Sequence, residues 1–219
     1  MNVLNFVKDI FFTLKKLLLL FLFSLFIVLS KGQSFEQELR QSLSEKPKFE
    51  FRFDSRNSFI NQSSVRVIGI KAGIQFEKKL SFGLGYNQLW SKIKKEISIN
   101  SNIYQGTIGY YYISPYVEYA FYKDERWQLS IPVQFGFGES FYTYRVGDER
   151  KFLSRKFVCS YEPAIAFEYR FLDYFGAGMG VGYRLMIATN KELDEQFTSP
   201  VYIFKLKIYF ERLWEDIKP

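Results

Sequence analysis

Residues 127–138 read WQLSIPVQFGFG, and this stretch decides the class of fold. Every odd position from Trp127 to Phe137 is apolar, while the even positions hold Gln, Ser, Pro or Gly. A period of two places successive side chains on opposite faces and is typical of a β-strand with one apolar face. No helical stripe of comparable length follows Phe49. The sequence therefore predicts an all-β fold.

The same alternation continues on both sides of this stretch and predicts eight strands. The first places Phe49, Phe51 and Phe53 on one parity. The other seven cover residues 65–77, 80–91, 104–122, 126–146, 156–171, 174–188 and 201–213.

The predicted connections alternate in length. Tight hairpins are expected at residues 77–79, 123–125 and 172–173. Longer polar connections are expected near residues 55–63, 92–103, 147–155 and 189–199. Short turns at one rim and long loops at the other predict an eight-stranded antiparallel up-and-down β-barrel.

The volume of the aromatic side chains decides which parity faces outward. Aromatic residues make up 20% of the chain, with 25 Phe and 16 Tyr. Roughly twenty of them share the apolar parity, and the interior of an eight-stranded barrel is too narrow to hold them all. Only lipid stabilises an exposed apolar belt of this size, so we expect a transmembrane barrel. A soluble periplasmic or secreted lipid-binding barrel, with its apolar residues inside, stays open as an alternative.

Aromatic residues flank the expected tight turns and predict a girdle at the membrane interface. Its members are Phe76, Phe82, Phe121, Trp127, Phe171 and Phe175. Three prolines, Pro115, Pro132 and Pro163, fall within strands and are expected at bulges or above the membrane. The strands at 104–122 and 126–146 exceed the about 9–11 residues needed to cross, so their outer ends should project as a hairpin.

The N-terminus has the pattern of a cleavable signal peptide. Three lysines precede the apolar run Leu17–Leu29, which is shorter than the roughly 20 residues of a spanning helix. Small residues at Gly32 and Ser34 predict cleavage after Ser34, with an uncleaved anchor as the alternative. The predicted organisation is a signal peptide at 1–34, a periplasmic lead-in at 35–47, the barrel at 48–214 and a periplasmic tail at 215–219.

Composition excludes several kinds of chemistry. The chain has no histidine, which excludes Ser-His-Asp and Cys-His triads and histidine metal sites. Cys159, the only cysteine, falls on the lipid-facing parity, where an inert thiol is expected. The formal charge of +7 falls to about +4 without residues 1–34, which is too weak for nucleic acid. We expect a protein that is not an enzyme and has no cofactor or metal.

Charged residues on the inward parity form the main candidate site. In a narrow lumen such charges must pair, because an unpaired buried charge costs several kcal/mol. Two interpretations stay open: a salt-bridged plug that closes the barrel, or a small passive channel for water or ions. The predicted network contains Glu50, Arg52, Lys71, Glu118, Glu162, Glu168, Arg170, Arg184, Lys205, Lys207 and Glu211.

The expected loop at 92–103 is a second candidate site. It opens with Lys92, Lys94 and Lys95. These cations predict contact with anionic lipid headgroups, such as those of lipopolysaccharide, or with a surface protein. An ordinary solvated loop is the simpler interpretation of the same residues.

Residues 48–213 resemble the OmpA/OmpX-type small outer-membrane barrels. The resemblance rests on architecture, and its most specific part is the last strand, Tyr202–Phe210. It implies location in the bacterial outer membrane, contact with its lipid, and a final strand read by the barrel-assembly machinery. Because the chain continues through Trp214 to Pro219, the terminal aromatic of that signal is either Phe210 or Trp214. The family has no common activity. The implied assembly signal consists of Phe204, Leu206, Ile208 and Phe210.

Overall fold

The computed structural model describes residues 36–37, 39–60, 63–76, 79–99, 101–193 and 196–209. The chain divides into two units, residues 1–45 and 46–219. In the first unit, residues 36–37 and 39–44 are helical, within the predicted lead-in. Among the described residues, no helix is both long and apolar enough to cross a membrane. The predicted signal peptide and the predicted tail lie outside the described residues.

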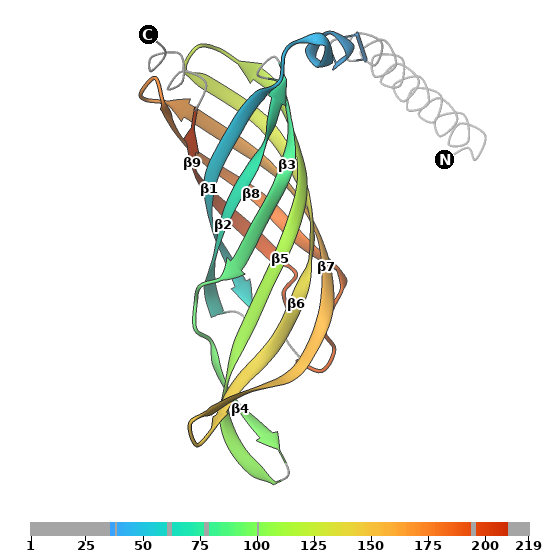
Figure 1. Ribbon diagram of the computed structural model, residues 1–219, viewed down its shortest axis with the longest axis vertical. Coiled ribbons are helices and arrows are strands. Elements are labelled where there is room, and N and C mark those ends of the chain that lie inside the picture. The colour runs from blue at the N-terminus through green and yellow to red at the C-terminus, as the bar shows by residue number, and fades with distance from the viewer. Residues whose placement is uncertain are drawn as a thin grey trace, which may run out of the picture. The chain divides into compact units, whose positions relative to one another are not determined.

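The second unit is a single antiparallel sheet closed into a ring (Figure 1). Neighbours in the ring follow the order β3-β2-β1-β9-β8-β7-β6-β5, and a β3–β5 pairing closes it. The additional strand β4 pairs with β5 outside this ring. Eight strands therefore form the barrel, as predicted. The strands are β1 (Lys48–Ile60), β2 (Ser63–Phe76), β3 (Leu80–Leu89), β4 (Lys94–Ile99), β5 (Asn102–Lys123), β6 (Trp127–Val146), β7 (Glu149–Arg170), β8 (Phe175–Ala188) and β9 (Ser199–Ile208).

Three of the four long connections predicted from sequence are wrong. The stretch at 55–63 is mostly strand, because β1 runs to Ile60 and β2 begins at Ser63. The stretch at 92–103 contains β4, which forms a hairpin with the start of β5. At 147–155, β6 and β7 meet at a tight turn in which Gly147 adopts a φ of 61°. Polar residues at these places favour loops, but backbone pairing continues beyond the apolar part of each strand.

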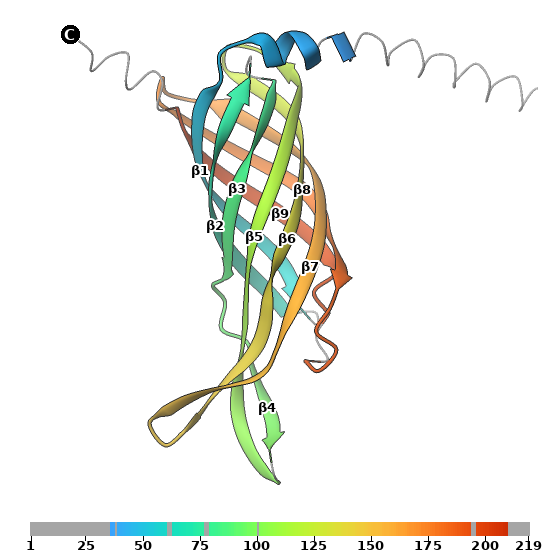
Figure 2. The ribbon, with the colours of Figure 1, turned by 45° about the vertical axis from the view of Figure 1, so that its right-hand side comes forward.

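Strands β5, β6 and β7 extend far beyond the rest of the barrel (Figures 1 and 2). β5 and β7 have 22 residues and β6 has 20, compared with 14 for β8. At about 3.3 Å per residue, a 22-residue strand is roughly 70 Å long, more than twice the thickness of a bilayer core. The predicted projecting hairpin is confirmed, and β7 and β4 take part in it. We call β4 and those parts of β5, β6 and β7 that lie beyond the ends of the other barrel strands the extension.

The prolines do not lie at bulges, and this prediction was wrong. Between β5 and β6 the pairing stops near Pro115 and resumes with unchanged register. The β6–β7 and β7–β8 ladders pass Pro132 and Pro163 in the same way. Pro115 lies between the exposed Ile113 and Val117 on the outer face, Pro132 is buried next to the exposed Ile131, and Pro163 lies two residues before the exposed Ile165, so all three are within the apolar belt. Proline lacks one N–H, so the ladder loses a hydrogen bond without needing an extra residue. The register shifts lie elsewhere, at Ala120/Tyr122, Ser140/Tyr142 and Cys159/Ser160.

The amphipathic pattern reverses along the barrel. Near the tight turns, apolar side chains such as Ile70 and Ile74 are exposed, while Lys71 between them is buried. Toward the extension the same strand buries Val65 and Val67 and exposes Arg66. The first arrangement suits lipid outside and polar groups inside, and the second suits water outside. The switch marks where the strands leave the apolar belt.

Candidate functional site

Ionisable side chains fill the lumen within the apolar belt. The inward face of β1 alone alternates in sign through Glu50, Arg52, Asp54 and Arg56. Five carboxylates and six cations are at most 6% exposed, so the charges nearly balance. These buried groups are Glu50, Asp54, Glu118, Glu162, Glu168, Arg52, Arg56, Lys71, Arg184, Lys205 and Lys207.

Glu118 of β5 contacts three other strands at the end of the lumen near the tight turns. It pairs with Arg52 of β1 and lies 3.1 Å from Lys205 Nζ of β9. Ser130 on β6 donates a 2.6 Å hydrogen bond to the same carboxylate. Hydrogen bonds to a charged acceptor are the strong ones, and each here crosses between elements. Glu118 therefore ties opposite walls of the barrel together.

Glu50 forms the next pairing toward the turns. Lys207 Nζ lies 2.9 Å from one of its oxygens, and Tyr116 donates a 2.9 Å hydrogen bond to the other. Lys207 also lies 3.8 Å from Glu168. The chain of pairs thus continues across β9 and β7.

A second chain of pairs lies toward the extension. Asp54 contacts Lys71 at 3.0 Å and Arg56 at 2.7 Å. Arg56 also pairs with Glu162, whose other oxygen lies 3.0 Å from Arg184. Four strands supply these groups, so the pairing exists only in the closed barrel.

Tyr116 links the two chains of ion pairs. Arg52 and Lys71 approach its ring at 4.6 and 4.9 Å from the centroid, respectively. A cation over an aromatic face is attracted by the ring quadrupole. Gly73 and Gly83 face each other across β2 and β3, and a Cβ on Gly73 would meet the Tyr116 hydroxyl. Glycine there leaves the space that the ring occupies.

An apolar cluster covers the lumen where the strands leave the belt. We call it the mouth cluster: Ile60, Val65, Val67, Leu89, Ile97, Ile108, Tyr110, Tyr112, Tyr142, Val158, Leu193 and Phe197. Two of these, Leu193 and Phe197, belong to the β8–β9 connection, which folds inward. The rings of Phe197 and Tyr110 are 5.0 Å apart, and Tyr142 donates a hydrogen bond to the Leu193 carbonyl.

Asn190 fastens this connection to the wall. Its side-chain amide donates to the carbonyl of Ser140 at 3.0 Å and to that of Ser154 at 2.6 Å. Both acceptors lie on the long strands β6 and β7. The mouth is thus covered by an ordered segment packed on Tyr and Val side chains.

The apolar belt ends at a small polar cluster on the outer surface. Tyr111 donates to Glu139, and Arg155 Nε donates to the same carboxylate at 2.7 Å. Both hydrogen bonds lower the pKa of Glu139, and the bond to Glu139 raises the pKa of Tyr111. Between Trp127 and Phe137 the outward positions of β6 are apolar, and that span has about the length of a membrane-crossing strand. The cluster therefore marks one boundary of the belt.

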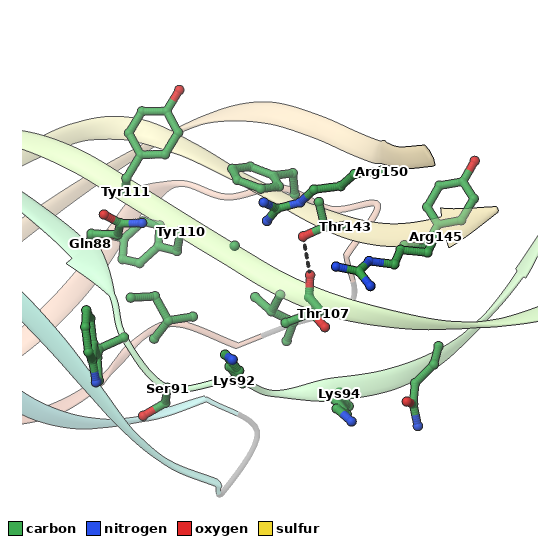
Figure 3. A pocket seen from close by; sticks show the side chains of 17 residues that line it. Gln88, Ser91, Lys92, Lys94, Thr107, Tyr110, Tyr111, Thr143, Arg145 and Arg150 are labelled. Atoms are coloured by element: carbon green, nitrogen blue, oxygen red, sulfur yellow. Dashed lines mark hydrogen bonds between the residues drawn. The ribbon is translucent and has the colours of Figure 1, made fainter. Parts of the chain in front are cut away.

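The extension contains a large cleft, with a volume of about 1320 Å³ (Figure 3). Lys92 and Lys94 contribute from the β3–β4 connection and β4, and Arg145 and Arg150 from the β6–β7 hairpin. Thr143 donates a hydrogen bond to the Thr107 carbonyl beneath them. The structure thus brings two of the three predicted loop lysines together with arginines from a distant segment.

Most of the predicted charge network comes together in the lumen. Arg170 is only partly buried and lies over the ring of Tyr209, 4.5 Å from its centroid. Glu211 lies outside the described residues. The prediction missed Asp54 and Arg56, although the alternation from Glu50 onward would have included them. Brought together in the lumen are Glu50, Arg52, Lys71, Glu118, Glu162, Glu168, Arg184, Lys205 and Lys207.

The aromatic residues of the predicted girdle lie beside the tight turns. The ring centroids of Phe76 and Phe82 are 5.3 Å apart, and those of Trp127 and Tyr169 are 4.2 Å apart. Phe121 and Phe171 are exposed on the outside. Phe175 is half-buried and pairs with Ile208 of β9.

The last strand presents Phe204 and Leu206 to the outside, at 50% and 42% exposure. Phe210 lies outside the described residues. Within the described ranges, no group of three or more Cys, Asp or Glu side chains could hold a metal ion.

This fold is that of the small outer-membrane β-barrels, with apolar side chains outside and charges inside. Neisserial surface protein A has a TM-score of 0.56 to this chain at 13% identity, covering 75% of this chain and 99% of its own. The N-terminal β-barrel domain of Pseudomonas aeruginosa OprF has a TM-score of 0.43 at 10% identity, covering 74% and 98%. Ail, the attachment invasion locus protein of Yersinia pestis, has a TM-score of 0.44 at 9% identity, covering 74% and 96%.

No family model and no curated protein matches the sequence. At 13% identity, the likeness to Neisserial surface protein A establishes the fold. The predicted eight-stranded transmembrane β-barrel is confirmed, and the chain is an outer-membrane β-barrel protein by fold.

Proposed function

We propose that this protein is a closed, non-conducting barrel of the bacterial outer membrane that holds the extension outside the bilayer as an interaction surface. The lumen carries this proposal. Its charges pair across the barrel, and the mouth cluster covers them. A passive channel needs a continuous polar path, whereas here an apolar layer lies across the end of the charged layer.

The interior also argues against a soluble lipid-binding barrel. Such a barrel encloses an apolar cavity, but the lumen within the belt is filled mainly by ion pairs, amides and hydroxyls, with a few apolar side chains such as Ala164 and Ile203 among them. The exposed side chains of the belt, such as Leu84 at 61% and Ile165 at 59%, would associate in water. These observations support lipid as the solvent of the belt.

We propose no catalytic role. The chain has no histidine, and the lumen carboxylates are held by cations and not left free to act as acid or base. During biogenesis, β9 would present Phe204, Leu206 and Ile208 to the barrel-assembly machinery before it pairs with β1. The aromatic residues beside the tight turns would anchor the periplasmic interface.

Planar-bilayer recording tests the closed barrel. The purified full-length protein, folded in detergent and added to the bilayer, should give no steady unitary conductance. The Leu193→Ala/Phe197→Ala double variant should give conductance events more often, because it removes the apolar layer over the lumen. Steady current through the unmodified protein, at a level unchanged in the variant, would refute the proposal.

A further inference from the structure

The cleft in the extension gathers positive charge without opposing carboxylates. Among its 17 lining residues, four are Lys or Arg and none is Asp or Glu. The cleft is open to solvent, and Figure 3 shows its cationic side chains arriving from separate segments of the chain. Lys and Arg close to one another repel, so a fold that collects them stores electrostatic energy that an anion would relieve.

Other cations of β7, the strand that carries Arg150, are paired with carboxylates. Arg155 pairs with Glu139, Lys156 lies 3.1 Å from Glu192, and Lys151 lies 3.5 Å from Glu149. In contrast, the four cleft cations form no ion pair with any residue that the structure describes. These cations of β7 are therefore neutralised by carboxylates, whereas the cations that line the cleft are not.

Arg145 and Arg150 are direct cross-strand partners in the β6–β7 hairpin. Like charges directly opposite each other destabilise a strand pair. A turn as short as Gly147-Asp148 leaves these side chains little freedom to separate. Two guanidinium groups side by side suit a phosphate, sulphate or carboxylate, each of which can accept bidentate hydrogen bonds.

The rest of the lining fits a sugar. Trp90 is 68% exposed, and Tyr111, Phe141 and Tyr144 add further aromatic faces. Aromatic faces pack against the C–H faces of pyranose rings, while amides and hydroxyls bond to their hydroxyl groups. The polar lining groups are Gln88, Ser91, Gln105, Thr107 and Thr143. A volume of about 1320 Å³ exceeds the roughly 300–1,000 Å³ of small-molecule pockets, which leaves room for several sugar units.

We infer that the cleft binds an anionic oligosaccharide, with its phosphate or sulphate groups at Arg145 and Arg150 and its rings against the aromatic lining. The inference rests on the proposed function only for placing the extension outside the bilayer. The same chemistry occurs in phosphorylated sugars of the protein's own membrane and in sulphated sugars of another surface.

Fluorescence anisotropy on the full-length protein, folded in an uncharged detergent, tests this inference. The probes are a labelled phosphorylated core oligosaccharide from deacylated lipopolysaccharide, a labelled heparin-derived hexasaccharide, and uncharged labelled maltohexaose. We expect saturable binding of an anionic probe and at least tenfold weaker binding of maltohexaose. Preference for the phosphorylated probe would identify the protein's own membrane as the source, and preference for the sulphated probe another surface.

The Arg145→Gln/Arg150→Gln variant should weaken binding of the anionic probe about tenfold or more. The control Lys151→Gln/Lys191→Gln loses the same charge outside the cleft and should weaken binding less than twofold. A Lys92→Gln/Lys94→Gln variant tests the other wall, should the arginine variant fold poorly. Equal losses in the cleft and control variants, or no binding of either anionic probe, would overturn the inference. Because none of these measurements involves conductance, their failure leaves the closed-barrel proposal unaffected.

Discussion

Replacing Glu118 with Gln should destabilise the barrel by about 3–5 kcal/mol, the usual cost of removing one partner from a buried ion pair. Gln keeps the size and shape of the side chain, so no cavity contributes. Arg52 would keep Glu50 at 3.7 Å. Lys205 Nζ, 3.1 Å from Glu118, has no other carboxylate within ion-pair distance among the described residues. Most of the destabilisation should therefore come from a buried, uncompensated ammonium group.

Reversible urea unfolding from phospholipid vesicles, followed by tryptophan fluorescence, would measure this change. Adding Lys205→Met should restore part of the lost stability, because the double variant removes both charges. Glu139→Gln is the matched control: it makes the same chemical change outside the belt, where exposed ion pairs contribute about 0–1 kcal/mol.

Two results would refute this reasoning. A loss below about 1 kcal/mol in Glu118→Gln would mean that water solvates the lumen charges. Additive effects of Glu118→Gln and Lys205→Met would mean that the two side chains are not coupled. Either result would also favour the passive channel over the closed barrel.

Three further predictions concern the β8–β9 connection, the wall of the lumen and the polar cluster around Glu139. Phe197→Ala should cost about 3 kcal/mol in urea unfolding and speed hydrogen exchange in the β8–β9 connection; unchanged exchange would contradict its packing role. Gly83→Ala should cost about 1–3 kcal/mol, since its Cβ would lie 2.2 Å from the Ala72 carbonyl; wild-type stability would refute that close approach. Because its hydrogen bonds lower the pKa of Glu139, the stabilisation from this carboxylate is present at neutral pH and is lost as the pH falls through that lowered pKa. Removing one donor with Tyr111→Phe should raise the NMR titration midpoint of Glu139, and an unmoved midpoint would show that the bond is not formed.

Much of the charge network could be predicted because alternate residues of a strand face opposite sides of the barrel wall. Once Phe49, Phe51 and Phe53 were assigned to the outside, Glu50 and Arg52 had to face inward. Asp54 and Arg56 were missed because the residues between them and beyond are also polar, as in a loop. The full length of β1 identifies them, because four consecutive positions of its inward face alternate in charge.

The mouth cluster was harder to predict because apolar side chains change faces. Val67 and Ile68 are adjacent and apolar, and they mark the point where β2 reverses its amphipathic pattern. Tyr110, Tyr111 and Tyr112 span a similar point on β5. Such runs have no clear period of two, so the alternation of apolar and polar residues alone does not predict where a strand passes from membrane to water.

By itself, the sequence determined the all-β class, the number of barrel strands and the side of each strand that faces lipid. These follow from a local period of two and from the volume of the aromatic residues. Only the tertiary structure decided which cation meets which carboxylate, that the β8–β9 connection covers the lumen, and that Arg145 and Arg150 share a cleft with Lys92 and Lys94. Those contacts join residues far apart in the chain, and they depend on strand register and ring closure, which no local pattern specifies.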